Sequence, residues 1–414
     1  MSTILLLLDA FRCDYLSKET TPFLWKCAHE GEHYERVVQS LGFCERTEIL
    51  TGMRGDESGF FTAIGFDTLN SPYATAKGLS FLHFAEQVVL FLLKFVPQTF
   101  GNKIQKRLRS YVQWYFRQQG IIMPSFLIPF TWLRYFALTE DRMDLRWTNA
   151  FSRPSIFTLL TEAGKTYFYD SFTALGLATP YASDQERLDA VVRDLGEGKK
   201  DLYLVYVSIP DTYGHLYGPE SIEFRTILLD MDQMLEQFVG QAEAASSKNR
   251  FLFVGDHGML TVTERFNAES EIENILHSAR LKKGKDVLYF LDSTMVRLWA
   301  MNDMARKTLP GLLQNVSGFS AYGTWMDVGT AECYHVPWPD RRYGDHLWLA
   351  NPGVLVFPDF FHRIAPCKGM HGYNPHIQKS QGVCIRWGEG VALKTYPTLP
   401  LSTVFELLRQ SVGV

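Results

Sequence analysis

The sequence predicts an α/β protein with a mostly parallel central sheet and helices on both faces. Short continuous apolar runs, typical of strands buried on both sides, alternate with longer segments of helical periodicity. The predicted strands are 4–8, 202–207, 251–254 and 354–357. A helical pattern at 222–245 lies between the second and third runs, as expected where a helix connects two parallel strands.

A first helix is predicted within 20–31, directly after the first strand and its turn. Thr21 is a typical N-cap residue, Pro22 suits the first turn, and Gly31 ends the pattern. This arrangement of a strand followed by a helix agrees with the α/β prediction.

The order of these patterns divides the chain into a discontinuous core and two additional parts. The core comprises 1–74, 151–285 and 351–414, and a small cap subdomain is expected at 286–350. Residues 75–150 form a predicted helical insertion, in which basic and aromatic residues interleave with apolar ones. The insertion is interpreted either as a lid packed on the core or as an interfacial, lipid-facing surface. None of its segments has the 18 or so uncharged apolar residues of a membrane span.

Composition excludes several classes of protein. The 414 residues include 41 Lys and Arg against 45 Asp and Glu, and 46% are hydrophobic. This apolar content excludes a mainly disordered chain, and the near-neutral balance argues against a nucleic-acid polymer as partner. Six cysteines without CxxC spacing argue against zinc ribbons and disulfide frameworks. The start of the sequence lacks a basic segment, and its apolar run stops at Asp9, so a cytoplasmic location is expected.

Acidic residues and histidines follow the predicted strands. Taken singly, an aspartate there is often a turn cap and a loop histidine is often exposed. Together they offer six ligands of the types that Zn, Mn or Fe prefer, with Zn favoured, and the numbers match two ion sites. The candidate ligands are Asp9, Asp211, His215, Asp256, His257 and His371. The other histidines are predicted to be structural or exposed, with His376 the least certain of them.

Seven segments resemble motifs of the type I phosphodiesterase/nucleotide pyrophosphatase branch of the alkaline phosphatase superfamily. They are DAFRCDYL at 9–16, TPFL at 21–24, ILTG at 49–52, DESG at 56–59, DTYGH at 211–215, GDHGM at 255–259 and HGY at 371–373. The resemblance implies one metal on Asp211, His215 and His371, and a second on Asp9, Asp256 and His257. It also implies a Ser or Thr nucleophile between the two ions.

The nucleophile position departs from the family pattern. The aligned place holds Gly42, which has no side chain. Cys44 could serve as a thiolate, Thr47 or Ser40 could supply a hydroxyl, or water could attack directly. A further alternative is a site that binds phosphate esters without turnover.

Arg46 has two interpretations. Its guanidinium could hold phosphate oxygens bidentately, or it could pair with neighbouring glutamates at the start of a helix. The sulfatase motif Cys-x-Pro-Ser-Arg is absent, which argues against a formylglycine sulfatase.

The expected function is hydrolysis of phosphodiester, pyrophosphate or related phosphoryl bonds, with two divalent metal ions as cofactors. Cys44, Arg46 and Thr47 are the candidate catalytic residues. The substrate is expected to be a small phosphate ester or diphosphate, with an apolar, lipid-like or aromatic part suggested by the aromatic insertion. A phosphoryl or phosphoalcohol transferase and a non-catalytic binding protein are the alternatives. The oligomeric state is left open.

Overall fold

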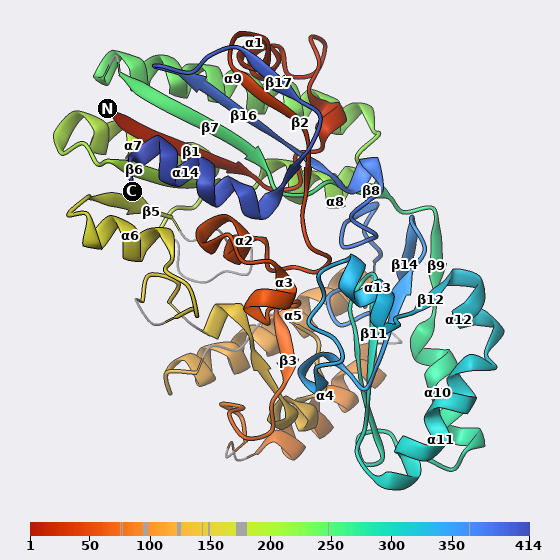
Figure 1. Ribbon diagram of the computed structural model, residues 1–414. Coiled ribbons are helices and arrows are strands. Elements are labelled where there is room, and N and C mark those ends of the chain that lie inside the picture. The colour runs from red at the N-terminus through yellow and green to blue at the C-terminus, as the bar shows by residue number, and fades with distance from the viewer. Residues whose placement is uncertain are drawn as a thin grey trace.

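The computed structural model describes the whole chain except residues 75, 77, 94–97, 122–125, 143, 148–149, 171–179, 247 and 364. Its centre is an eight-stranded sheet with helices on both faces (Figure 1). Across the sheet the order is β17 (Lys394–Tyr396), β2 (Glu32–Val38), β16 (Gly382–Gly388), β7 (Asn249–Gly255), β1 (Ser2–Leu8), β6 (Leu202–Val207) and β5 (Tyr167–Tyr169), with β18 (Leu399–Pro400) also paired to β2. The predicted α/β fold is therefore confirmed.

The strand β1 lies between two parallel neighbours, and this register positions the site. All seven of its residues are buried, as its continuous apolar sequence predicts. Leu8 is level with Val207 of β6 and with Gly255 of β7. The carboxyl ends of three strands therefore meet at one edge, where open α/β sheets bind ligands.

The sheet is mixed rather than purely parallel. Among the described strands, β16 pairs antiparallel with both β2 and β7, while the other pairs in this sheet are parallel. The expectation that 354–357 joins the central sheet is wrong. Those residues form β14 (Val354–Val356), a buried strand that instead pairs with β9 (Glu264–Phe266) in a separate two-stranded sheet. Burial on both faces makes such a run apolar whichever sheet it joins.

Helices cover both faces of the sheet and form two apolar cores with it. One face is covered by α1 (Pro22–Glu30), α7 (Asp184–Glu197) and α9 (Ile222–Ala245). The other is covered by α2 (Glu45–Thr51), α6 (Ile156–Glu162) and α14 (Val404–Val412). Figure 1 shows α9 on one side of the strands and α14 on the other.

The start of α1 is capped differently from the expectation. Thr21 is the N-cap residue, but its hydroxyl donates to the carbonyl of Tyr15 instead of accepting from the helix. The free N–H groups of Phe23 and Leu24 donate to the carboxylate of Asp232 on α9, at 2.7 and 3.0 Å. A side chain more than 200 residues away in the sequence thus satisfies the helix end.

The remaining elements build a further apolar core below the central sheet (Figure 1). An antiparallel sheet contains β10 (Val287–Leu291), β11 (Met295–Ala300), β13 (His346–Ala350) and β12 (Gly323–Trp325). Helices packed on this core or joined to its strands are α10 (Ala268–Ser278), α11 (Asp303–Gln314), α12 (Ser317–Tyr322) and α13 (Val328–Cys333). Two short antiparallel strand pairs complete this part of the fold. They are β3 (Ile64–Phe66) with β4 (Phe136–Leu138), and β8 (Leu260–Thr261) with β15 (Gly369–Met370).

Residues 75–150 contribute α4 (Leu79–Leu93) and α5 (Gln98–Arg117). Leu79, Val112, Phe116 and Phe126 bury their side chains in the same core as the antiparallel sheet. Within the described residues, no helix combines the length and apolar character needed to cross a membrane.

Candidate metal centre

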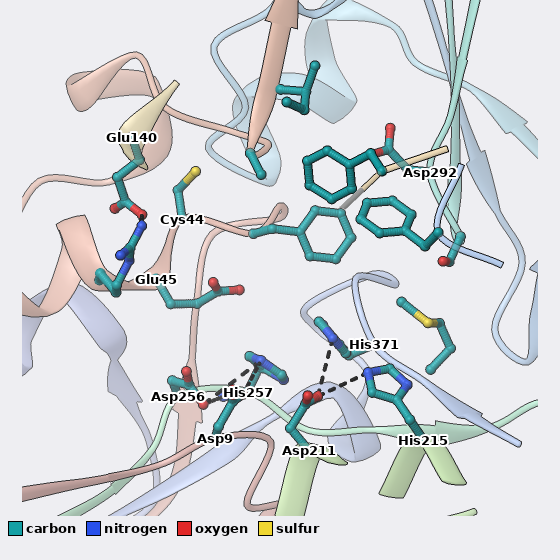
Figure 2. A pocket seen from close by; sticks show the side chains of 18 of the residues that line it. Asp9, Cys44, Glu45, Glu140, Asp211, His215, Asp256, His257, Asp292 and His371 are labelled. Carbon is teal, nitrogen blue, oxygen red and sulfur yellow. Dashed lines mark hydrogen bonds and ion pairs between the residues drawn. The ribbon is translucent and has the colours of Figure 1, made fainter. Parts of the chain in front are cut away.

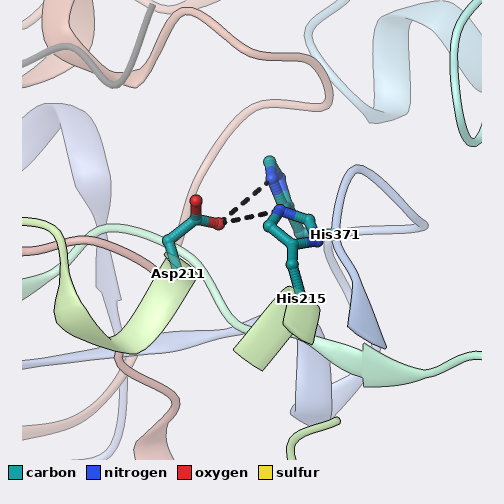
Figure 3. Close-up of side chains that lie close together, drawn as sticks. All are labelled: Asp211, His215 and His371. Atoms are coloured by element: carbon teal, nitrogen blue, oxygen red, sulfur yellow. Dashed lines mark ion pairs between the residues drawn. The ribbon is translucent and has the colours of Figure 1, made fainter. Parts of the chain in front are cut away.

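The first ligand set combines Asp211, His215 and His371. The helix α8 (Ile209–Tyr217) begins directly after β6 and presents Asp211 and His215 from successive turns. His371 follows β15, which the pair with β8 brings to the same place. Asp211 Oδ1 lies 3.1 Å from His215 Nε2 and 3.5 Å from His371 Nε2 (Figure 3). The structure thus brings together residues that follow two different predicted strands.

The second set combines Asp9, Asp256 and His257, from the ends of β1 and β7. His257 Nε2 lies 3.2 Å from Asp9 Oδ1 and 3.9 Å from Asp256 Oδ1 (Figure 2). The ligand atoms of each set lie within 4.8 Å of one another. Gly255 permits the close packing here, because a Cβ on it would stand 2.1 Å from the carbonyl of Phe11.

The two sets are adjacent. The rings of His257 and His371 are stacked with centroids 4.3 Å apart, and that of His215 lies 5.2 Å from His371. The two candidate ligand sets therefore form one centre.

Backbone carbonyls orient two of the imidazoles. His215 Nδ1 lies 2.8 Å from the carbonyl of Gly369, and His257 Nδ1 lies 3.0 Å from that of Gly258. Only a protonated nitrogen can donate to a carbonyl, so the neutral form of each ring has its lone pair on Nε2. Both Nε2 atoms face the carboxylates. Hydrogen bonds from the other ring nitrogen to a carbonyl orient metal-binding histidines in this way.

The carboxylates at this centre are crowded. Burial raises the pKa of Asp9, and the neighbouring Asp211 raises it further. Burial also raises the pKa of Asp256 to about 7, with Asp9 adding to the shift and His257 opposing it. For Asp211, burial acts to raise the pKa, but His215 and His371 outweigh it and hold the pKa well below its usual range. Cations placed among these groups would offset the repulsion and the loss of water contacts.

A cavity of about 440 Å³ opens over the two ligand sets. All six candidate ligands share its lining with apolar and aromatic side chains. The apolar part consists of Leu7, Phe43, Ala63, Ile64, Phe126, Phe290, Phe361 and Met370. The cavity therefore combines ionisable groups, which include Glu140, Asp292 and His362 besides the ligands, with an apolar surface suited to an apolar group.

Gly42 lies where a side chain has no room. Its φ is +132°, which L side chains rarely adopt, and a Cβ on it would stand 2.2 Å from the carbonyl oxygen of Phe61. A threonine or serine at this position would therefore require the backbone to move. The loop conformation therefore requires a glycine at position 42, where the family pattern has a Ser or Thr.

Cys44 and Glu45, at the start of α2, both line the cavity but point in different directions. Figure 2 shows the sulfur of Cys44 directed away from the six metal-binding candidates, while the Glu45 carboxylate extends into the cavity toward Asp256 and His257. Cys44 instead lies near Tyr343, whose pKa is raised mainly by burial and further by Cys44. Loss of water contacts raises the pKa of Glu45 to about 8, with Asp256 and Asp9 adding to the shift and His257 opposing it.

Arg46 and Thr47 share Glu140 as a partner. The guanidinium of Arg46 donates to Glu140 Oε2 through Nη2 at 2.6 Å and Nε at 2.9 Å. Thr47 donates to Glu140 Oε1 from its backbone N–H at 2.9 Å and from its hydroxyl, and its side chain is buried. Arg46 lines the same cavity as the candidate ligands, whereas Thr47 does not belong to the lining. Ser40 is also buried, and its Oγ accepts from the N–H of Gly55.

Several side chains that line the cavity are not predicted from the sequence, among them Glu45, Phe126 and Glu140. Glu45 lies three residues after Gly42, the position that departs from the family motif. That spacing is the only signal in the sequence that could have indicated a role for Glu45. Phe126 and Glu140 come from the 75–150 segment, which has no motif. Of the histidines predicted to be structural or exposed, His362 lines the cavity, whereas His376 lies 3.7 Å from the sulfur of Cys333.

Known proteins share the fold of this chain. The human ectonucleotide pyrophosphatase/phosphodiesterase 5 structure has a TM-score of 0.69 at 15% identity, over 100% of this chain and 95% of that one. An inactive murine form of that protein, in complex with AMP, gives the same values. In sequence, human ectonucleotide pyrophosphatase/phosphodiesterase family member 7 is 32% identical over 99 residues, which span 22% of this chain and 21% of that protein.

A family model covers most of the chain. The model for type I phosphodiesterases/nucleotide pyrophosphatases matches residues 3–374, a range that contains all six metal-binding candidates and the α2 loop. The chain therefore belongs to the type I phosphodiesterase/nucleotide pyrophosphatase family, a branch of the alkaline phosphatase superfamily.

Proposed function

We propose that the chain is a metal-dependent hydrolase of phosphodiester or pyrophosphate bonds in small molecules. The convergence of two Asp/His ligand sets at the floor of one cavity is the observation that supports this most strongly. The AMP bound to the murine relative favours a substrate with a nucleotide-sized phosphate ester.

The residues present fit two divalent ions. Ligands about 2 Å from a tetrahedral ion lie about 3.3 Å apart, close to the distances of 3.1, 3.5 and 3.2 Å between three pairs of candidate ligand atoms. Mixed imidazole and carboxylate donors favour Zn, with Mn or Fe as alternatives. When bound, two such ions neutralise phosphoryl oxygens and stabilise the charge that develops on the leaving oxygen.

We further propose that water is the attacking group and that Glu45 accepts its proton. Gly42 offers no hydroxyl, and the Cys44 sulfur points away from the ligands (Figure 2). Water attacks phosphorus, one proton passes to the Glu45 carboxylate, and the bond to the leaving oxygen breaks. A proton acceptor whose pKa lies near the working pH is the most effective one.

The aromatic wall of the cavity would orient the remainder of the substrate. Phe126, Phe290 and Phe361 belong to its lining. The rings of Phe126 and Phe361 stand edge to face with centroids 4.7 Å apart, which makes that part of the wall rigid. An aromatic or apolar leaving group fits this surface better than a charged one.

The proposal is tested by hydrolysis of bis(p-nitrophenyl) phosphate by the full chain. We expect activity that EDTA removes and Zn or Mn restores, and that Asp211→Asn lowers at least 100-fold. Asp303→Asn, an exposed acid on α11, is the matched control and leaves the rate unchanged. Activity that survives EDTA would exclude metal-dependent hydrolysis. Product release without acceptor alcohols distinguishes hydrolysis from phosphoryl transfer.

The proton acceptor is tested with two adjacent substitutions. Glu45→Gln is expected to lower kcat by about 10²- to 10⁴-fold with little change in KM. Cys44→Ala is expected to lower kcat by less than about threefold, since its sulfur points away from the candidate ligands (Figure 2). The opposite ranking, together with a phosphorylated cysteine trapped by acid quench, would identify Cys44 as the nucleophile.

A further inference from the structure

The two helices of the insertion leave a set of large apolar side chains on the surface. On α4 the exposed residues are spaced at three or four positions and so share one helix face. The exposed set is Phe81, Phe84, Val88, Phe91 and Leu92 on α4, with Tyr111, Trp114 and Tyr115 on α5. We call these residues the hairpin surface.

Exposed apolar side chains are concentrated here. Of the 17 large hydrophobic residues exposed in the described part of the chain, eight belong to the hairpin surface, including Phe81 at 71% and Trp114 at 54%. The others, such as Trp147 and Leu216, are scattered over separate elements. Scattered apolar residues need no explanation, whereas a concentration of them indicates a binding surface.

The charge of the same segment is strongly positive. Residues 79–117 contain six Lys and Arg against the single acid Glu86, while the whole chain has a net charge of −4. Glu86 is buried and paired with Arg109, whose Nε and Nη2 donate to it at 2.7 and 2.9 Å. Arg107 and Arg117 are exposed, and Arg107 shares a helix face with Tyr111 and Trp114. The segment therefore presents exposed cations beside aromatic rings.

The helix pair α4 and α5, called the hairpin below, is attached to the wall of the cavity. Besides pairing with Glu86, Arg109 donates from Nη1 to the carbonyl of Phe126 at 2.7 Å and from Nη2 to that of Ile128 at 3.0 Å. The Phe126 side chain lines the cavity over the metal centre. One buried guanidinium thus joins α4, α5 and the cavity wall.

We propose that the hairpin surface binds an anionic lipid surface. Aromatic side chains favour the boundary between lipid headgroups and acyl chains, and exposed cations are attracted by anionic lipids. Both features occur together here, with a positive charge that complements the lipid. The finding that no described helix can span a membrane agrees with a hairpin that lies on the surface. The inference is independent of the proposed hydrolysis.

Vesicle flotation with the full chain tests this binding directly. We expect binding to vesicles of phosphatidylcholine with phosphatidylserine, weaker binding to pure phosphatidylcholine, and a loss at high salt. Arg107→Gln with Arg117→Gln should weaken the partition coefficient about 25-fold on the anionic vesicles, about fivefold for each charge. Phe84→Ser with Trp114→Ser should weaken it at least tenfold on both compositions.

Matched variants and a second measurement keep the test specific. Trp147→Ser removes an exposed tryptophan elsewhere, and Arg306→Gln with Lys307→Gln removes two exposed cations on α11. These controls should bind as the unchanged chain does, and thermal melts should show that all variants are folded. No binding to anionic vesicles, or equal loss in the controls, would overturn the proposal. Light scattering that shows a dimer disrupted by Trp114→Ser, without vesicle binding, would identify the surface as an interface between copies and would also overturn it.

Discussion

At the scale of single residues, Gly42 shows how a local departure from a motif has a structural cause. The sequence shows that a hydroxyl is missing at this position. The structure adds that the backbone at φ +132° and the carbonyl of Phe61 leave no room for a Cβ. A simple exchange to threonine therefore cannot supply the missing group, which favours chemistry that does without it.

Replacement of this glycine is predicted to destabilise the fold. Gly42→Ala introduces both an unfavourable backbone conformation and a clash, so we expect the free energy of unfolding to fall by about 2–4 kcal/mol. Urea denaturation measures the change. Gly164→Ala is the control, because Gly164 also has a positive φ but nothing within 4 Å of its Cβ position. That control isolates the conformational cost of about 1 kcal/mol, and an equal effect in both variants would argue against a clash at Gly42.

At the scale of elements, the helix α2 and the loop before it are held by acidic side chains. Glu140, from the 75–150 segment, accepts from the N-terminal turn of α2 through Thr47. Glu48, within the helix, accepts from the N–H of Ser40 at 2.9 Å. Both carboxylates are buried, and together they position the loop that contains Gly42 and Glu45.

The buried Glu48 should make the stability of this element depend on pH. Burial raises the pKa of Glu48 to about 7, against about 4.5 in the unfolded chain. Between these values the folded state keeps a proton that the unfolded state loses, so stability falls as pH rises and is constant above about 7. Glu48→Gln stays neutral and can still accept from Ser40. We expect it to be more stable than the unchanged chain by up to about 3 kcal/mol at pH 8, with no difference near pH 4.

Urea denaturation at both pH values provides the measurement. The exposed Glu162→Gln on α6 controls for the loss of one negative charge. A stabilisation by Glu48→Gln that is the same at pH 4 and pH 8 would contradict the buried, proton-binding role.

At the scale of the whole molecule, the metal centre links distant parts of the chain. Its candidate ligands follow β1, β7 and β15 or lie on α8, so bound ions would connect three neighbouring strand ends of the central sheet with the β8–β15 pair. Ions that bind only the folded state stabilise it by an amount that grows with the logarithm of their concentration relative to the Kd.

Metal removal should therefore lower thermal stability. An ion at 100 times its Kd stabilises the folded chain by about 2.7 kcal/mol, so we expect EDTA treatment to lower the Tm by several degrees and added Zn to restore it. Differential scanning calorimetry measures the shift. His371→Ala should have a smaller shift, whereas His376→Ala, outside the cavity lining, should respond as the unchanged chain does. Equal Tm values with and without Zn would argue against metal binding at this centre.

The sequence by itself determined the features that depend on local pattern. The run 202–207 and the helix 222–245 are found as β6 and α9 with the predicted bounds, because burial and helical periodicity leave a direct mark on composition. The motif residues at strand ends also come together, since the carboxyl ends of parallel neighbours share one edge.

Tertiary structure decided which distant segments meet. It placed β14 outside the central sheet, supplied Asp232 as the cap of α1, and brought Phe126 and Glu140 to the cavity. It also turned Glu45, rather than Cys44, toward the ligands (Figure 2). A buried strand or a capping carboxylate has the same local composition whichever partner it meets. Its place is set by contacts between residues far apart in the chain, and those contacts form only when the whole molecule packs.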